Sequence, residues 1–166
     1  LQETVALDGA HSITNPELEH RLEWCGTHND ISWYNDSKAT IMESTLAAVN
    51  QLHDRPLILL LGGLSKGVDR QPYFQHIGRN VKLIICFGKE AEMLASSAAH
   101  HSLQAIAYAT LEDAHSAAIA HALPGDAILL SPGGSSYDLF ANYKERGKRF
   151  KELVHHVSLT NKKIVE

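Results

Sequence analysis

Four short apolar runs, alternating with stretches that have the pattern of helices, constrain the fold more than any other feature of this sequence. The runs are residues 57–61, 81–87, 105–108 and 127–130. Such near-continuous apolar runs are typical of strands that are covered on both faces. The helical stretches are residues 40–52, 73–79, 90–100, 111–122 and 138–157. Crossovers long enough to hold a helix join parallel strands. We therefore predict an α/β fold with an open, mainly parallel, Rossmann-like sheet and helices on both faces.

A short hairpin precedes these runs. Residues 22–27 and 31–35 have the alternation and composition of strands, and a compact polar turn joins them. Residues 1–17 read as a polar linker, so we expect the domain to span residues 18–160, followed by a tail at 161–166. The first residue is a leucine, not a methionine, and we expect the chain to be part of a longer protein.

Charge and composition exclude several classes of function. The formal net charge is −4 at pH 7, with 44% hydrophobic and 20% charged residues, which is ordinary for a soluble globular domain. Nothing in this charge favours binding to nucleic acid or to an anionic membrane, and no apolar run approaches the roughly 20 residues of a transmembrane helix. Cys25 and Cys86 lie in strand-like runs and are predicted to be free thiols. A monomeric protein of the cytoplasm is the simplest prediction.

The loops after the predicted strands are the candidates for a binding site, because the carboxyl ends of parallel strands meet at one edge of the sheet. Residues 36–40 lead from a strand into a helix. Thr40 and Glu43 have the spacing of a capping box, and Lys38 adds a cation beside a helix N-terminus, which favours anions. Taken alone, these residues are equally compatible with simple helix caps.

Two further loops at the same edge are rich in glycine. Residues 62–69 read GGLSKGVD, and residues 131–138 read SPGGSSYD. Glycine lets a backbone approach a ligand closely, and Lys66 supplies a positive charge. Neither loop matches the Walker A or the dinucleotide-binding pattern, and each alone is compatible with an ordinary tight turn. Three polar loops at one edge favour a site for an anionic small molecule.

Other segments carry no site in this interpretation. The loops at 88–90 and 109–112 read as plain helix starts, with Thr110 and Asp113 as a capping pair. No nucleophile triad or zinc motif is present, so we predict no catalytic residue and no metal site in this chain. Helical spacing predicts a buried face of the last helix at Phe140, Tyr143, Phe150, Leu153 and Val154. A solvated basic face is predicted at Lys144, Arg146, Lys148, Arg149 and Lys151.

Motifs along most of the chain resemble those of the C-terminal domain of the Mur ligases, which are ATP-dependent ligases of peptidoglycan synthesis. Residues 35–40 read NDSKAT, residues 61–67 read LGGLSKG, and residues 130–147 begin with LSP, continue through SYDLF and end with ERG. Residues 20–23, HRLE, are similar to the segment where the central domain of the family joins this one. The resemblance covers about residues 18–154, in the order that the family shows.

The resemblance implies a three-domain enzyme, of which residues 1–17 are the end of the central domain. The N-terminal domain holds the UDP-sugar, the central domain carries the ATP P-loop, and the C-terminal domain presents the amino acid. In the branch whose motifs match, ATP phosphorylates the carboxylate of UDP-N-acetylmuramoyl-L-alanine with help from Mg²⁺, and the amine of D-glutamate attacks the acyl phosphate. ATP and Mg²⁺ are then held mainly by the central domain, and a chain without the P-loop is expected to be inactive alone.

Site residues follow from the resemblance by motif. It implies a D-glutamate site lined by Thr40, Lys66, Ser136, Tyr137 and Tyr143. It also implies that three residues face the nucleotide, namely Arg21, Asp36 and Lys38. The residue types agree with this assignment, because a dicarboxylate needs cations and hydroxyl or backbone donors at fixed positions.

Two departures from the family pattern and two alternative functions stay open. Residues 133–135 are Gly-Gly-Ser where the family often has small apolar residues, so we expect a looser and more polar loop, and Ile41 stands where the family often has Asn. The first alternative is a relative that adds a different amino acid, such as another Mur ligase or a folylpolyglutamate synthase. The second is a standalone α/β binding or signalling module. A receiver-like module needs an acidic cluster, whereas this edge offers Asp36 and Asp69 only.

Overall fold

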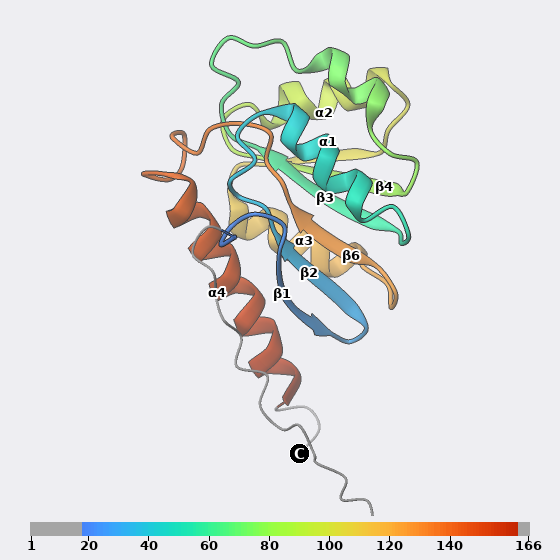
Figure 1. Cartoon of the computed structure of the whole chain (residues 1–166), viewed down its shortest axis with the longest axis vertical. Coiled ribbons are helices and arrows are strands. Elements are labelled where there is room, and N and C mark those ends of the chain that lie inside the picture. Colours follow the sequence, from blue (N-terminus) through green and yellow to red (C-terminus); the bar gives the residue numbers. More distant parts are fainter. Residues whose placement is uncertain (1–17, 163–166) are drawn as a thin grey trace, which may run out of the picture.

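A computed structural model describes residues 18–162 of the 166-residue chain, with side chains described through residue 158. The linker predicted at residues 1–17 lies outside the described residues, as do residues 163–166. Within the described part, six strands form one sheet, and four α-helices and one 3₁₀ helix pack against it (Figure 1). No helix in this part is long and apolar enough to cross a membrane.

The sheet contains both the predicted hairpin and the four apolar runs. Its strands are β1 Glu23–His28, β2 Ile31–Asn35, β3 Leu57–Gly62, β4 Val81–Phe87, β5 Ala105–Tyr108 and β6 Ala127–Leu130. They are ordered β1-β2-β6-β3-β4-β5; β1 pairs antiparallel with β2, and the other neighbours pair in parallel. This order confirms the open, mainly parallel sheet. The hairpin is part of it, because β2 pairs directly with β6.

Helices cover both faces of the sheet, as predicted. They are α1 Met42–Gln51, the 3₁₀ helix η1 Gln71–His76, α2 Ala91–His100, α3 Leu111–His121 and α4 Tyr143–Lys162. Alternate residues of β3 serve the two sides: Leu57, Leu59 and Leu61 pack in the core of α1, η1 and α2, whereas Ile58 and Leu60 pack in the core of α3 and α4. Figure 1 shows α1 in front of the sheet, α3 behind it, and α4 along the side of β1 and β2.

The helix predicted at 73–79 is shorter than expected. η1 is a six-residue 3₁₀ helix with Pro72 in its first turn, and it ends at His76. Pro72 has no backbone N–H to donate, and Gly78 disfavours continuation of a helix, so no α-helical ladder builds up here.

The last helix begins later than predicted. α4 starts at Tyr143 rather than at residue 138. The Asn142 side chain accepts a hydrogen bond from the Glu145 N–H (2.9 Å) and so satisfies a donor that the first helical turn leaves unpaired. The helix continues through Lys162, so the predicted tail at 161–166 begins as helix.

One predicted helix cap is confirmed. Thr110 precedes α3, and its hydroxyl accepts from the Asp113 N–H (3.1 Å) and donates to the Asp113 carboxylate (2.8 Å). The predicted state of the cysteines is confirmed as well, because Cys25 and Cys86 are both free thiols. The predicted buried face of α4 is correct at Phe150 and Val154, which are fully buried.

The capping box predicted for Thr40 and Glu43 is wrong. α1 is preceded by Ile41 in extended backbone, which makes no side-chain cap, and the Glu43 carboxylate accepts from the Tyr73 hydroxyl instead. The loop just before the helix is instead tied to the loop after β6, because Ala39 O accepts from the Gly133 N–H (2.9 Å).

Candidate functional site

The loops that leave the carboxyl edge of the sheet are joined to one another by backbone hydrogen bonds. The Gly133 N–H donates to Ala39 O (2.9 Å), which ties the loop after β6 to the loop after β2. Leu64 and Ser135 exchange two hydrogen bonds of 2.9 Å, which tie the loop after β6 to the loop after β3. The three polar loops predicted from the sequence therefore form one connected surface.

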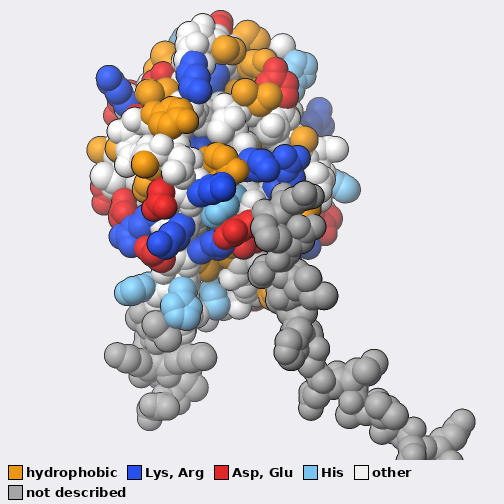
Figure 2. All heavy atoms as spheres, turned by 60° about the vertical axis from the view of Figure 1, so that its left-hand side comes forward, with side chains coloured by type: hydrophobic (Ala, Val, Ile, Leu, Met, Phe, Trp, Pro, Cys, Tyr) orange, Lys and Arg blue, Asp and Glu red, His pale blue; other side chains and the backbone are white. Residues whose placement is uncertain are grey.

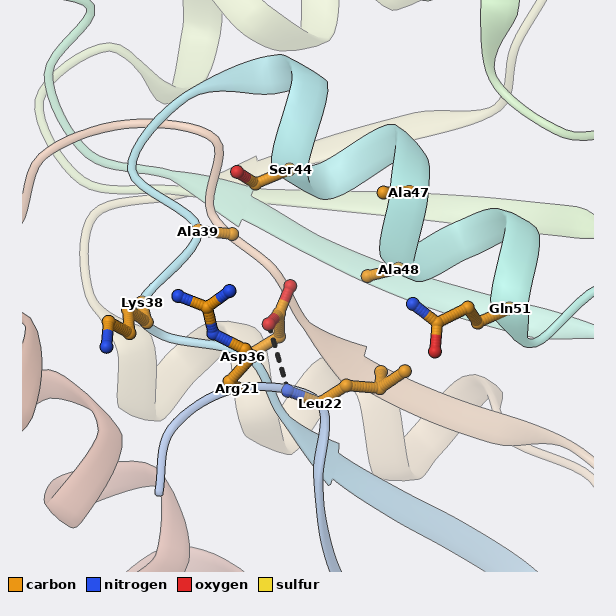
Figure 3. Close-up of a pocket in the computed structure, with 9 residues that line it drawn as sticks. All are labelled: Arg21, Leu22, Asp36, Lys38, Ala39, Ser44, Ala47, Ala48 and Gln51. Carbon is orange, nitrogen blue, oxygen red and sulfur yellow. Dashed lines mark hydrogen bonds between the residues drawn. The ribbon is translucent and has the colours of Figure 1, made fainter. Parts of the chain in front are cut away.

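A pocket of about 180 Å³ opens between the segment before β1, the loop after β2 and α1 (Figure 3). All three residues predicted to face the nucleotide line it: Arg21, Asp36 and Lys38. The opposite wall is a face of α1 on which Ala47 and Ala48 leave room. Figure 3 shows Arg21 and Asp36 side by side in the pocket. The structure thus brings two cations and one carboxylate to the same cavity.

Asp36 is largely buried in the wall of this pocket, and both of its carboxylate oxygens accept hydrogen bonds. Its Oδ1 accepts from the Leu22 N–H (2.9 Å), and its Oδ2 accepts from the Ser131 hydroxyl (2.7 Å). Burial raises the pKa of the Asp36 carboxyl, and the hydrogen bonds together with the nearby Arg21 charge oppose that rise. Each carboxylate oxygen keeps a second lone pair, so Asp36 can still accept a hydrogen bond from a ligand hydroxyl.

The segment that carries Arg21 is held in an uncommon backbone conformation. His20 and Leu22 have φ values of 62° and 42°, which residues with side chains adopt rarely. The Lys38 N–H donates to His20 O (3.0 Å), and the Asn35 side-chain amide donates to His20 Nδ1 (2.8 Å). Burial lowers the pKa of the His20 imidazole, and the amide donor requires Nδ1 to be unprotonated. The neutral, buried His20 therefore ties its segment to Asn35 and Lys38, which places Arg21 close to Lys38.

Three of the five residues predicted for D-glutamate lie on the two glycine-rich loops, namely Lys66, Ser136 and Tyr137. Lys66 Nζ lies over the Tyr137 ring, 5.3 Å from its centroid, so the loops after β3 and β6 present a cation and an aromatic ring together. Both side chains are exposed. Ser136 is buried, with 2% of its surface exposed, and Thr40 is exposed just before α1. The structure therefore pairs Lys66 with Tyr137 directly.

Tyr143 occupies a different position from the other four. Its ring lies edge-on to His20, with 6.1 Å between the centroids, and its carbonyl accepts from the Ser37 hydroxyl (2.7 Å). The ring thus borders the segment that carries Arg21.

The loop after β6 is tightly packed, which overturns the expectation of a looser loop. Residues 131–136 are all buried. Gly133 has a φ of 65°, and a Cβ there would lie 2.5 Å from Met42 Sδ. A Cβ on Gly63, where φ is 69°, would lie 2.2 Å from Ser135 O. Gly63 is required because its loop touches the backbone of the loop after β6, and Gly133 because it packs against side chains of α1.

Sequence reasoning missed Arg70, which joins the loops after β3 and β4. Its guanidinium is buried and donates to Gly62 O (2.8 Å) and Gly63 O (3.0 Å). It also pairs with Glu90 (2.6 Å), whose carboxylate accepts from the Ser65 N–H (3.1 Å). The loop after β4, which read as a plain helix start, is therefore part of the same edge.

Arg146 was predicted to lie on a solvated face of α4, and that prediction is wrong. The residue is 1% exposed, and its guanidinium donates to Ser37 Oγ (3.0 Å), Ser37 O (2.8 Å) and Gly134 O (3.1 Å). Its spacing of four from Phe150 was the signal that places it on the buried face. The solvated face is correct for Lys144 and Lys148, which are exposed, whereas Arg149 and Lys151 are partly buried and pair with carboxylates; Figure 2 shows basic and acidic side chains interspersed over this side of the molecule.

The pocket residues suit an anionic group better than a bare metal ion. Within residues 18–162, no cluster of three or more His, Cys, Asp or Glu side chains is placed to hold a metal. The Arg21 and Lys38 side chains make no hydrogen bond to any described residue, so both are available to a ligand such as a phosphate.

A comparison with protein families identifies the family of this chain. Residues 20–134 match the model of the family described as Mur ligase, glutamate ligase domain. The chain belongs to the Mur ligase family. Among curated relatives, the UDP-N-acetylmuramoylalanine–D-glutamate ligase of Bacillus mycoides is 43% identical over 142 residues, which make up 83% of this chain and 30% of the relative. The chain thus spans about a third of the length of the curated relatives that it matches.

Solved structures of two other ligases share the fold. A bifunctional folylpolyglutamate synthase/dihydrofolate synthase of Yersinia pestis, solved with AMPPNP and a Mn ion, superposes with a TM-score of 0.57 at 16% identity, over 82% of this chain and 31% of that one. The UDP-N-acetylmuramate-alanine ligase of Thermotoga maritima superposes with a TM-score of 0.56 at 10% identity, over 83% and 30% of the two chains. At these identities the likeness shows the fold alone.

The Mur ligase match separates the predicted site residues into two groups. The matched span, 20–134, contains the three pocket residues together with Thr40 and Lys66. The remaining three predicted residues, Ser136, Tyr137 and Tyr143, follow its end. The family model therefore does not cover these three residues.

Proposed function

We propose that this chain is the C-terminal domain of a UDP-N-acetylmuramoylalanine–D-glutamate ligase, with the domain spanning residues 18–160. In this proposal the carboxyl edge of the sheet holds D-glutamate beside a nucleotide. The observation that carries it is one hydrogen-bonded loop surface that bears both the pocket of Arg21, Asp36 and Lys38 and the Lys66–Tyr137 pair. The 43% identity to a D-glutamate ligase supports the choice of amino acid.

The pocket is the nucleotide half of the proposed site. Arg21 and Lys38 provide positive charge for phosphate oxygens, and Asp36 accepts from a hydroxyl. ATP and Mg²⁺ are bound mainly by the rest of the ligase; the Yersinia pestis enzyme of the same fold was solved with AMPPNP and a Mn ion. The chain offers this half two cations and one carboxylate, so its part is to orient the nucleotide.

The glycine-rich loops are the amino-acid half of the proposed site. Lys66 pairs with a carboxylate of D-glutamate, the hydroxyls of Ser136 and Thr40 donate to its carboxylate oxygens, and Tyr137 and Tyr143 border it. The amine of D-glutamate then attacks the acyl phosphate of UDP-N-acetylmuramoyl-L-alanine, which forms the amide and releases phosphate. The domain accelerates this step by holding the amine close to the acyl carbon. The reaction belongs to peptidoglycan synthesis in the cytoplasm.

Substitution of Lys66 tests the amino-acid half. In the longer ligase that carries this chain, Lys66→Met removes the cation, and we expect the KM for D-glutamate to rise about tenfold to a hundredfold, since a charge-assisted hydrogen bond contributes roughly 1.5–3 kcal/mol. The KM for ATP should change little. The measurement is phosphate release at saturating ATP over a range of D-glutamate concentrations.

Lys148→Met is the matched control, because Lys148 is an exposed lysine of α4 outside both halves of the site. It should behave like the unchanged enzyme. Phosphate release that depends on L-amino acids or on a folate substrate instead of D-glutamate would assign the chain to another ligase of the fold. A Lys66→Met enzyme with an unchanged KM for D-glutamate would remove Lys66 from the site.

A further inference from the structure

The guanidinium of Arg146 joins two loops that are far apart in the sequence. Its Nε and Nη2 donate to the hydroxyl and the carbonyl of Ser37, which lies 109 residues away, and its Nη1 donates to Gly134 O. Ser37 belongs to the loop after β2, and Gly134 to the loop after β6. The Ser37 hydroxyl also donates to Tyr143 O (2.7 Å), so the start of α4 is tied to the same point.

The charge of Arg146 has no directly bonded carboxylate among the described residues, because its acceptors are two carbonyls and a hydroxyl. Burial lowers the pKa of its guanidinium to about 10, against an opposing influence of the Asp138 charge, so the group remains cationic at neutral pH. A buried charge without a directly bonded counter-charge is costly, and an apolar residue of similar size avoids that cost. Stability alone therefore does not account for an arginine at this position.

The carbonyls that Arg146 holds lie next to the two halves of the proposed site. Ser37 O belongs to the peptide group that leads into Lys38, and Asp36 is its other neighbour. Gly134 O belongs to the peptide group that leads into Ser135, one residue before Ser136. Fixing these two carbonyls on one rigid, planar group fixes the nucleotide half relative to the amino-acid half.

We propose that Arg146 is a positioning residue of this site. It sets the distance between the loop of Asp36 and Lys38 and the loop of Ser136, and its unpaired positive charge favours anionic ligands above them. The proposal rests on the function proposed above. It differs from a purely structural role, because it requires ligand affinity to fall in variants that still fold.

Arg146→Lys and Arg146→Met separate these roles, with Arg149→Met as the matched control on the same helix. A lysine keeps the charge, but its single ammonium cannot reach both loops as the planar guanidinium does. Without ligand, the amide chemical shifts of the Lys variant should change at residues 36–38 and 133–136 but not at Ser65 and Glu90, where the Glu90 carboxylate bonds to both Arg70 and the Ser65 N–H. Calorimetric titration with ADP and with D-glutamate should show affinities about tenfold weaker or more in both Arg146 variants, and Arg149→Met should match the unchanged chain.

The outcomes distinguish this proposal from the proposed function. If a folded Arg146 variant binds both ligands as tightly as the unchanged chain, Arg146 is not a positioning residue; if Arg146→Met does not fold, Arg146→Lys decides. If the unchanged chain binds neither ligand, the proposed function fails, but the amide shifts without ligand still test the positioning. Shifts confined to α4 would then overturn it.

Discussion

Arg70 and Arg146 are both buried at the carboxyl edge of the sheet and both donate to loop carbonyls, yet they differ in their counter-charge. Arg70 pairs with Glu90 at 2.6 Å, whereas Arg146 donates to neutral oxygens. Burial lowers the pKa of both guanidinium groups, and the Glu90 charge opposes this for Arg70. The Arg70 side of the edge is thus neutralised from within the chain, while the Arg146 side keeps a positive charge that a ligand can compensate.

The largest loss of stability is expected when Arg70 loses its counter-charge and so becomes like Arg146. Glu90→Gln leaves Arg70 charged and buried without its counter-charge, so the free energy of unfolding should fall by about 3 kcal/mol. The lower end of the range for buried pairs applies, because the Glu90 side chain is 21% exposed. Urea unfolding followed by circular dichroism measures the change. Glu92→Gln, at an exposed position two residues further on in the first turn of α2, is the control. An equal loss in both variants would mean that the Arg70–Glu90 pair makes no special contribution to stability.

A smaller, pH-dependent loss of stability is expected in α3 and α4, on the face of the sheet from which Arg146 comes. His115 of α3 stacks on Trp33, with 4.9 Å between the ring centroids, and lies 6.1 Å from the Phe150 ring of α4. Burial lowers its pKa from 6.5 to about 4. The unfolded chain binds this proton at higher pH than the folded chain does, so the contribution of His115 to stability is complete above pH 6.5 and is lost as the pH falls toward 4. By pH 5 the loss is about 2 kcal/mol.

Urea unfolding at several pH values checks this prediction with two variants of α3. His115→Gln should remove most of the stability change between pH 6.5 and 5, while His121→Gln, at an exposed position, should keep it. His115 packs against Phe150 of α4, the helix that carries Arg146. Hydrogen exchange at pH 5 should therefore speed up in α4 before it does so in α2. Equal acceleration in both helices would show that the two sides do not respond separately.

The smallest effect concerns the contact that joins the two glycine-rich loops. Lys66 lies over the exposed Tyr137 ring, and an exposed cation–π contact contributes about 0.5–1 kcal/mol. Tyr137→Leu should therefore weaken D-glutamate binding by about twofold to fivefold without changing the midpoint of thermal unfolding. Tyr137→Phe keeps a ring and should bind as the unchanged chain does; a loss in Tyr137→Phe equal to that in Tyr137→Leu would assign the role to the hydroxyl instead.

The sheet was predictable because its signals are local. Each apolar run forms one strand. In Leu57–Gly62, alternate residues pack into the cores on the two faces of the sheet, so both sets of side chains are apolar. Of the pocket residues, Asp36 and Lys38 directly follow β2, and Arg21 lies just before β1, the hairpin partner of β2; the family motifs mark all three.

The two buried arginines were not predictable in the same way, because their roles depend on loops distant in the sequence. Arg146 stands in a run of basic residues that otherwise faces solvent, and only the packing of α4 on β1 and β2 turns it inward. Arg70 finds its partner Glu90 through the parallel pairing of β3 and β4. The Thr40 cap failed for a similar reason, since a hydrogen bond from Gly133 holds the chain just before it.

The amide chemical shifts of this chain, titrated with D-glutamate and separately with L-glutamate in the presence of ADP, test the central claim most directly. If the carboxyl edge is an amino-acid site, shifts should cluster at residues 38–40, 64–67 and 135–137 and should appear with the D form alone. Equal shifts with both forms would contradict the claim. So would shifts that cluster around the pocket of His53, His76 and Arg79 beside the start of β4, at the opposite edge of the sheet.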